Sequence, residues 1–226
     1  EVLGDFSNPV NGPVFFFFSE KGDALKVYIE SIIPRGDQPR GTTRTNPDFG
    51  GLTGTERIPN LCDPIPEIVK KVEVTEEAVK WSDEISFPYR PMVGTIGTSP
   101  EIDSISTMEP NKHGGNMDLP DARPGATIYL PVQVPGALLY LGDCHAVQGD
   151  GELCGTAVEQ PTHTTVKVEV VKDWEINWPR LENEDFIMSI GSTRPLENAT
   201  KIAYADLIKW MVTDYGFDKW DAQLKH

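Results

Sequence analysis

Proline and glycine recur at short intervals along the chain, and they constrain its fold more than any other feature. The 226 residues include 19 prolines and 20 glycines. Both residues interrupt regular structure and favour turns, so the segments between them are short. This spacing suits a sandwich or barrel of short strands joined by many turns, and it disfavours a helical or doubly wound fold.

Four segments between these turns have the composition of strands. They are short and rich in β-branched or aromatic residues, and they comprise residues 14–18, 25–33, 127–134 and 164–171. In the last two segments apolar residues alternate, which places them on one face of a strand. The alternating residues are Ile128, Leu130, Val132 and Val134 in one segment and Val166, Val168 and Val170 in the other. We therefore predict half-buried strands.

One helix is predicted near the C-terminus. It begins near Glu197 or Asn198 and ends at Gly216, because glycine commonly follows the last helical turn. Its predicted apolar stripe contains Tyr204, Ala205, Ile208, Met211, Val212 and Tyr215. The fold is therefore expected to be mainly β, a β-sandwich or barrel of short strands with an α+β C-terminal segment.

The predicted organisation has two parts, or one continuous unit that combines them. Residues 1–110 make a β-rich N-terminal part, in which residues 36–66 lack periodicity and form a long excursion over the surface. Residues 73–83 fit a short strand or a short helix. Residues 111–226 make a β-rich catalytic core with the C-terminal helix.

Composition and charge narrow the class of protein. A hydrophobic content of 38% suits a chain that buries a core. The net charge of −15 opposes binding to nucleic acid or to an anionic membrane surface. No apolar run approaches the ~20 residues of a membrane span. Cys62, Cys144 and Cys154 form an odd, unspaced set, which indicates reduced thiols in a cytoplasmic protein.

Polar groups gather on glycine turns in the central third of the chain, between residues 113 and 159. Asn116 and Asp118 are two residues apart, as are Asp143 and His145, so in extended backbone each pair projects from one face. Carboxylate and imidazole groups together suit a divalent cation, with zinc as the first choice and calcium or magnesium as alternatives. An Asp-x-His pair also commonly braces a loop through hydrogen bonds.

Further polar residues of this region have separate interpretations. Asp150 and Glu152 fit a solvated hairpin turn, because Asp-Gly is a common turn sequence. Glu159 ends a stretch of small and apolar residues, where an ionised carboxylate is costly unless it is paired or used, and it is the candidate general base. Cys144 faces away from its neighbours on an extended strand and is expected to be a buried spectator.

Several of these segments resemble the acetamidase/formamidase family. The specific matches are His113–Asp118, Pro124–Ala137, Gly142–Glu152 and Cys154–Glu159. Weaker similarity extends over Asn8–Pro13, Gly22–Val27, Ile85–Gly97 and the stretch from Pro179 through Ala203, so that nearly the whole chain is covered.

The resemblance implies metal-dependent hydrolysis of small carboxamides, such as formamide and acetamide, to the acid and ammonia. It also implies a β-sandwich and barrel with an appended α+β part, and a homo-oligomer. Members of the family usually carry further β-rich segments before the counterpart of Asn8 and after that of Phe217. We therefore expect a chain truncated at both ends, whose missing segments could complete the site.

The expected mechanism assigns these residues three roles. The predicted cation ligands are Asp118, Asp143 and His145. Glu159 accepts a proton from the water that attacks the amide. Asn116 or Gln148 donates to the developing oxyanion or holds the substrate amide. Two alternatives stay open: a β-sandwich that binds a cation or small polar ligand without turnover, and a hydrolase of lactams or N-carbamoyl compounds on the same site.

Overall fold

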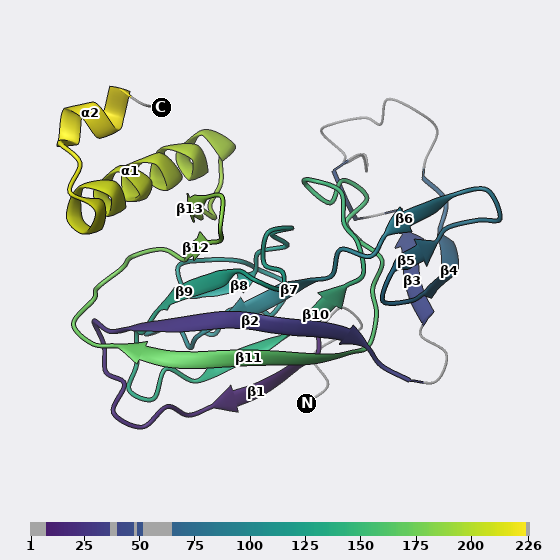
Figure 1. The fold of residues 1–226 in the computed structure, drawn as a ribbon, viewed down its shortest axis with the longest axis horizontal. Coiled ribbons are helices and arrows are strands. Elements are labelled where there is room, and N and C mark those ends of the chain that lie inside the picture. The colour runs from purple at the N-terminus through teal and green to yellow at the C-terminus, as the bar shows by residue number, and fades with distance from the viewer. Residues whose placement is uncertain (1–7, 37–39, 48, 52–64, 225–226) are drawn as a thin grey trace.

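A computed structural model describes residues 8–36, 40–47, 49–51 and 65–224 of the chain (Figure 1). The described residues form three antiparallel sheets and two helices near the C-terminus. The prediction of a mainly β fold with a helical C-terminal segment is confirmed. No helix in these residues is both long and apolar enough to cross a membrane.

Each strand belongs to one of the three sheets. The first sheet has the order β1 (Val10–Val14), β10 (Leu139–His145), β7 (Met92–Gly97) and β8 (Gly114–Asn116). The second has the order β11 (Thr162–Val171), β2 (Ala24–Pro34), β9 (Thr127–Pro131), β12 (Arg180–Glu182) and β13 (Ile187–Ser189). The third has the order β3 (Arg40–Thr45), β4 (Ile68–Val74), β5 (Ala78–Lys80) and β6 (Ser86–Pro88). The helices are α1 (Leu196–Tyr215) and α2 (Lys219–Leu224).

The first two sheets share the main apolar core. Strands β2, β9 and β12 contribute Leu25, Val27, Ile29, Ile128, Leu130 and Leu181, and the first sheet contributes Val93, Ile96, Leu139 and Cys144. Fully burying one such side chain contributes roughly 1.5–3 kcal/mol. Strand β11 alternates between partly buried and exposed residues, as its sequence predicts. This two-layer core gives strand β10 a rigid base for the polar residues at its end.

Helix α1 ends as predicted, with Gly216 in the left-handed conformation at its C-terminal cap, but its N-cap is Pro195, two residues before the predicted Glu197. The predicted apolar stripe is wrong in part, because Tyr204 and Tyr215 are each 48% exposed. The helix instead buries Asp206 and Trp210. Trp210 packs beside Tyr129 and Ala24 on the outer face of the second sheet, which explains why β9 is buried on both faces. The helix departs from the predicted stripe because Asp206 pairs with Arg180 of β12.

The N-terminal strands differ from the prediction in three places. The strand expected at residues 14–18 lies at Val10–Val14, and Phe17 and Phe18 form an exposed turn. The expected surface excursion 36–66 contains strand β3, whereas Cys62 lies outside the described residues. Residues 73–83 are strands rather than a helix, since β4 ends and β5 lies there.

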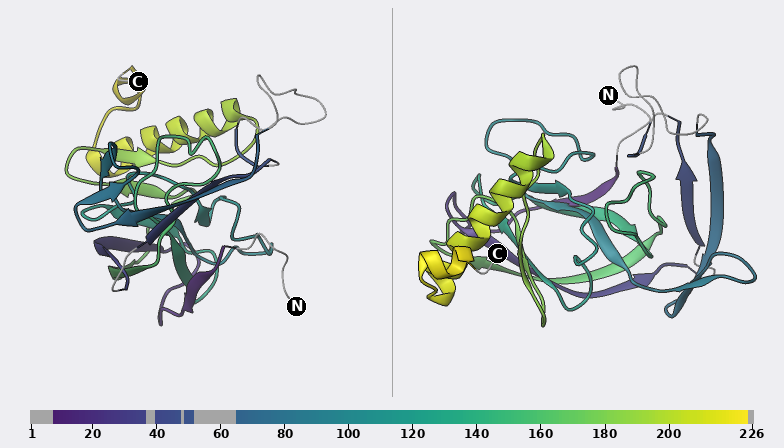
Figure 2. Two further views of the ribbon diagram at one scale, coloured as in Figure 1. Left: turned by 90° about the vertical axis from the view of Figure 1, so that its right-hand side faces the viewer. Right: turned by 90° about the horizontal axis from the view of Figure 1, so that it is seen from above.

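The third sheet lies at one end of the molecule and helix α1 at the other, as Figures 1 and 2 both show. A second apolar cluster joins Val72, Val74 and Val79 of the third sheet to Ala146 and Val158. Strands from the two predicted parts of the chain pair with one another in the first and second sheets. The boundary near residue 110 stays a prediction. Because Ala146 and Val158 pack against the third sheet, the residues that follow β10 lie between the sandwich and that sheet.

Candidate active site

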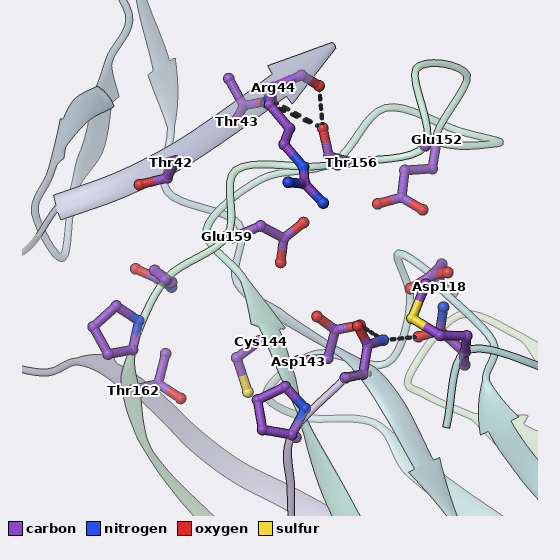
Figure 3. Close-up of a pocket in the computed structure, with 18 of the residues that line it drawn as sticks. Thr42, Thr43, Arg44, Asp118, Asp143, Cys144, Glu152, Thr156, Glu159 and Thr162 are labelled. Carbon is purple, nitrogen blue, oxygen red and sulfur yellow. Dashed lines mark hydrogen bonds between the residues drawn. The ribbon is translucent and has the colours of Figure 1, made fainter. Parts of the chain in front are cut away.

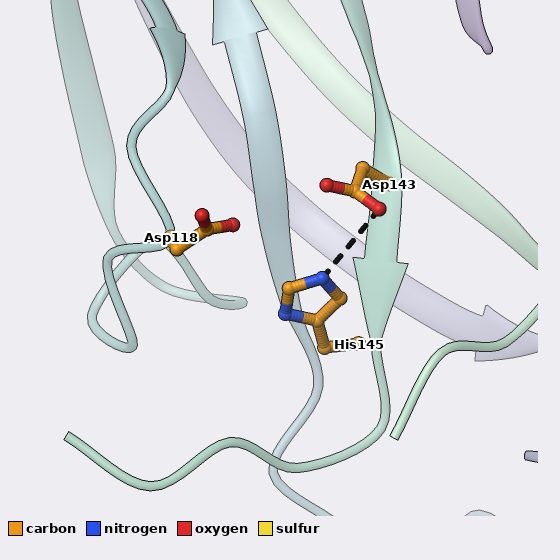
Figure 4. A group of neighbouring side chains, drawn as sticks. All are labelled: Asp118, Asp143 and His145. Atoms are coloured by element: carbon orange, nitrogen blue, oxygen red, sulfur yellow. Dashed lines mark ion pairs between the residues drawn. The ribbon is translucent and has the colours of Figure 1, made fainter. Parts of the chain in front are cut away.

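The predicted site residues lie at the junction of the sandwich and the third sheet. Asp143 and His145 belong to strand β10, and Asn116 ends β8. Glu159 forms β-bridges with Thr42 on one side and His145 on the other. Asp118, Asp143 and His145 each offer one ligand atom, and these atoms lie within 4.8 Å of one another (Figure 4). The structure therefore brings the three predicted ligands together.

Hydrogen bonds fix the tautomer of His145. The side-chain nitrogen Nε2 of Gln148 donates to the backbone oxygen of Asp118 at 2.7 Å, because a carbonyl oxygen can only accept. The other amide atom, Oε1, then accepts from Nδ1 of His145 at 2.8 Å. Nδ1 of His145 therefore carries a proton, and Nε2 is the nitrogen that can bind a cation.

The Nε2 atom of His145 faces two carboxylates. It lies 3.6 Å from Oδ1 of Asp143 and 3.2 Å from Oε2 of Glu159, and the imidazole is 1% exposed. Burial alone lowers the pKa of His145, but its interactions with Asp143 and Glu159 outweigh burial and raise that pKa to about 11. A lone pair facing two anions is unfavourable, so this nitrogen needs either a proton or a metal ion.

Asp118 supplies a second sign of a cation site. Its Oδ1 atom is buried and accepts no hydrogen bond from the described residues. Burial and the neighbouring charges of Asp143 and Glu159 together raise the pKa of Asp118 to about 6, against the opposing effect of His145. Buried oxygens without partners are costly, and a divalent cation would satisfy this one. The residues present therefore fit the metal that the family resemblance implies.

A polar network fixes Asp143 and Asn116 relative to each other. The Nδ2 atom of Asn8 donates to Oδ1 of Asn116 at 3.0 Å and to Oδ2 of Asp143 at 2.9 Å. Thr95 contacts the same two oxygens at 2.5 and 3.2 Å. With its oxygen held in this way, Asn116 directs its amide nitrogen elsewhere, and no described residue accepts a hydrogen bond from that nitrogen. Sequence patterns gave no sign of Asn8 or Thr95, because both act through contacts distant in the chain.

Gln148, a predicted oxyanion donor, makes two hydrogen bonds within the protein. Its amide nitrogen donates to the backbone of Asp118, and its oxygen accepts from His145. These contacts position the imidazole and the loop that carries Asp118, which is the usual function of groups behind metal ligands. The donor role of Gln148 stays a prediction.

Glu152 is a site residue that the sequence interpretation missed. We expected a solvated turn, and Asp150 is indeed exposed. Glu152, however, turns back toward the cluster and offers a ligand atom within 4.8 Å of those of His145 and Glu159. Burial and the charge of Asp118 raise the pKa of Glu152 to about 8. No local signal distinguishes it from an ordinary turn residue, since the loop conformation depends on tertiary contacts.

The backbone of the site is strained. Asp118, Asp143 and Glu152 have φ angles of 46°, 55° and 43°, in the left-handed region that most residues avoid. Such strain persists only where the surrounding structure enforces it, and it concentrates at functional sites. Gly94 permits the close packing, because a Cβ atom there would lie 2.8 Å from Oδ1 of Asp118 and 2.9 Å from Cε1 of His145.

Glu159 and Cys144 occupy different surroundings. The side chain of Glu159 is 37% exposed and pairs with His145, so it is less buried than its apolar sequence context suggested. Its Oε1 atom accepts a hydrogen bond from the backbone nitrogen of Ala157 at 3.0 Å. Cys144 is buried in the main apolar core, with its sulfur 3.5 Å from Oγ1 of Thr164. It therefore packs as a core residue.

The cluster opens into a cavity of about 900 Å³. Figure 3 shows Asp118 and Asp143 on one side of the cavity, with Glu152 and Glu159 above them. Arg44 of strand β3 reaches in from the opposite side. Concave sites of this size that combine a few placed polar groups are typical of small-molecule binding sites.

Known proteins share this architecture. The model of the Acetamidase/Formamidase family matches residues 103–202. An acetamidase structure from Yersinia enterocolitica has 55% identity and a TM-score of 0.92, over 96% of this chain and 66% of that one. An acetamidase structure from Bacillus halodurans has 32% identity and a TM-score of 0.85, over 96% of this chain and 70% of that one.

A curated relative gives the same result over a shorter segment. The formamidase of Methylophilus methylotrophus is 42% identical over 82 residues, which cover 35% of this chain and 20% of that protein. The chain thus spans only part of the length of its relatives. The similarity nevertheless extends across the sandwich, the third sheet and the residues of the cluster. This chain belongs to the acetamidase/formamidase family.

Proposed function

We propose that the protein hydrolyses short aliphatic carboxamides, such as formamide and acetamide, to the carboxylate and ammonia. The family supports this reaction class, because its relatives are named acetamidase and formamidase. The observation that carries the proposal is the orientation of His145, whose Nε2 atom faces Asp143 and Glu159 beside the unpartnered oxygen of Asp118. This arrangement suits a cation and a water molecule close to an open cavity.

The proposed metal ligands are Asp118, Asp143 and His145. Zinc suits the imidazole and the two carboxylates, and calcium or magnesium are the alternatives for such an oxygen-rich set. A divalent cation bound there would polarise the amide carbonyl and ease the loss of a proton from water. Gln148 keeps the correct tautomer of His145 through its hydrogen bond to Nδ1.

Glu159 is the proposed general base. Its carboxylate is held at one oxygen by the Ala157 backbone, while the other oxygen faces the cluster. With 37% of the side chain exposed, it can meet water from the cavity. A general base contributes about 10²- to 10⁴-fold to such reactions. Asn116 is the proposed substrate donor, because its oxygen is fixed by Asn8 and Thr95 and its amide nitrogen is left to bind the amide carbonyl.

The test combines metal analysis with an ammonia assay. Chelation with EDTA, or the substitution Asp143→Asn, should lower acetamide and formamide hydrolysis by at least about 10³-fold, because both the cation and its ligand charge are needed. The matched control is Asp150→Asn, which removes an exposed carboxylate from the neighbouring turn. Elemental analysis should find close to one ion per chain in the active protein.

Three outcomes would contradict the proposal. Full activity after chelation would exclude the metal, and full activity of Asp143→Asn would exclude this ligand set. Saturable binding of amides without any ammonia release would instead identify a binding module. Circular dichroism of each variant shows whether the fold is kept. We also propose a homo-oligomer, as the family resemblance implies, in the cytoplasm, as the reduced cysteines indicate. Light scattering measures the oligomeric state.

A further inference from the structure

The cavity is large for the smallest amides. Its volume of about 900 Å³ lies near the upper end of the range of roughly 300–1,000 Å³ that is typical of pockets for drug-sized ligands. The carboxylates line one region of it, beside the buried His145. Formamide or acetamide would therefore fill only the region next to the cluster, and the rest of the cavity would be left to a longer acyl chain.

Arg44 projects into that remaining space. Its backbone is held by Thr156, whose hydroxyl accepts from the Arg44 nitrogen at 3.3 Å and donates to the Arg44 oxygen at 2.6 Å. Figure 3 shows the guanidinium inside the cavity, on the far side of Glu159 from Asp143. None of the described residues forms an ion pair with it. A guanidinium that is fixed at its base and free at its tip is a ready site for an anion.

The lining beyond the carboxylates includes several threonines and the two cationic residues Arg35 and Arg44. Threonine hydroxyls line much of the cavity, from Thr42, Thr43, Thr156, Thr162 and Thr164. The acidic lining residues belong to the cluster and its surroundings: Asp118, Asp143, Glu152 and Glu159. The cavity therefore carries charge of both signs, negative in the four carboxylates and positive in Arg35 and Arg44. A cation bound at the cluster would reduce the repulsion that an anionic substrate meets there.

We propose that the site takes amides whose acyl chain ends in a carboxylate, with that carboxylate bound by Arg44 while the amide group lies at the cluster. The inference rests on the proposed amide hydrolysis and specifies its substrate class. A guanidinium binds a carboxylate through two parallel hydrogen bonds, which gives direction as well as affinity. Arg44 is then a specificity-determining residue, and the chemistry at the cluster is the same for neutral and anionic amides.

An alternative function for Arg44 makes a different prediction. If the guanidinium served only to balance the charge of Glu159, its removal would alter the general base and affect every amide to the same extent. If it binds the substrate, its removal affects only amides that carry a carboxylate. A pair of substrates with equal chain length separates the two cases.

The experiment compares succinamic acid with butyramide, in which a methyl group replaces the carboxylate. For the metal-loaded protein we expect kcat/KM to be about 10- to 100-fold higher for succinamic acid than for butyramide. This factor is the usual contribution of hydrogen bonds to a charged group. Arg44→Gln should remove this preference, mainly through KM, and change butyramide hydrolysis by less than about threefold. Arg44→Lys should restore part of it. Arg123→Gln, an exposed arginine outside the cavity, should change neither.

Binding measurements keep the inference separate from the proposed function. Calorimetry with succinate, the product expected from succinamic acid, should show weaker binding to Arg44→Gln than to the unsubstituted protein, whether or not amides are hydrolysed. Absence of ammonia from both amides would defeat the proposed function, and succinate binding would still decide the assignment of Arg44. Equal kcat/KM for the two amides, an equal loss of both in Arg44→Gln, or succinate binding that does not depend on Arg44 would overturn the inference.

Discussion

Two buried charged clusters in this molecule are built on opposite plans. Beneath helix α1, Arg180 and Asp206 form a two-point ion pair, with Nε–Oδ2 at 2.8 Å and NH2–Oδ1 at 3.0 Å. Ser189 donates to the same carboxylate at 2.7 Å, and Trp210 packs against the guanidinium at 5.0 Å. At the end of β10, by contrast, carboxylates outnumber cations around His145, and one buried oxygen of Asp118 has no partner among the described residues.

The contrast between the two clusters suggests that the first stabilises the fold and the second binds a ligand. In the first cluster Arg180 pairs with Asp206 and, at 3.8 Å, with Asp214, so its charge is compensated within the protein. The second cluster has excess negative charge, strained backbone and an open cavity beside it. Clusters of that kind are unstable unless something outside the chain completes them. Substitutions should therefore affect folding in the first cluster and activity in the second.

The largest effect on stability is expected from Asp206→Ala. The substitution leaves Arg180 charged and buried with only a longer contact to Asp214, 3.8 Å from its NH1 atom, which should lower the free energy of unfolding by about 3–5 kcal/mol. Urea unfolding measures the loss, and specific activity per folded molecule should be retained. The control is Glu73→Ala, which breaks an exposed pair with Lys80 and should cost less than about 1 kcal/mol. Equal losses in the two variants would show that the buried pair is not special.

A second prediction concerns the packing behind the site. Gly94→Ala places a Cβ atom 2.8 Å from the Asp118 carboxylate and from the Asp143 backbone oxygen, so the cluster must shift. Because small displacements of catalytic groups are costly, hydrolysis should fall by about 10²-fold. Gly149→Ala is the matched control, since its Cβ atom would meet nothing within 4 Å. Unchanged activity in Gly94→Ala would mean that the cluster tolerates movement.

A third prediction tests the positioning of His145. Gln148→Leu removes the oxygen that fixes the proton on Nδ1, and it should lower metal affinity or activity by about 10- to 100-fold. Gln133→Leu serves as the control, because Gln133 contacts the backbone of Glu101 outside the cavity. Zinc titration monitored by calorimetry measures the affinity. A loss confined to kcat, with metal affinity unchanged, would argue for a substrate contact by Gln148 instead.

The smallest expected effect is the number of protons released when zinc binds. Interactions with Asp143 and Glu159 outweigh burial and raise the pKa of His145 from 6.5 to about 11 in the metal-free protein. A raised pKa stabilises the folded metal-free protein below pH 6.5, and this contribution is lost as the pH rises toward 11. Because a metal needs the neutral ring, zinc binding at pH 7 should release about one proton per ion. Titration in weak buffer measures it, and zinc uptake without proton release would exclude His145 as a ligand.

Local patterns predicted the regular parts of the fold. The alternation in β11 and the glycine at the end of α1 are signals carried by neighbouring residues, and both were confirmed. The predicted stripe of α1 was wrong in part because Asp206 is buried by a partner 26 residues away. The phenylalanine run after Val14 has strand composition but ends in an exposed turn at Phe17 and Phe18, since composition does not show which side chains other segments will cover.

The site was predictable to the extent that its residues lie close together in the chain. The two-residue spacing in β10 identified Asp143 and His145 as candidate ligands. The structure places Asp118 beside them. Glu152 was missed because its glycine-rich turn looks like any other. The network around Asp143 was missed as well, because Thr95 acts across the sheet, 48 residues away. Sequence spacing therefore indicated the ligands, and tertiary structure added the groups that hold them.

The reach of Asn8 also bears on the order of folding. It joins Asn116 and Asp143 across 108 and 135 residues of chain. Closing such long loops is entropically costly and slow, so contacts of this kind form after the local turns and hairpins. Partly folded chains should accordingly have no assembled ion site. Uptake of metal would then report arrival at the native state, and a newly made chain could not capture an ion prematurely.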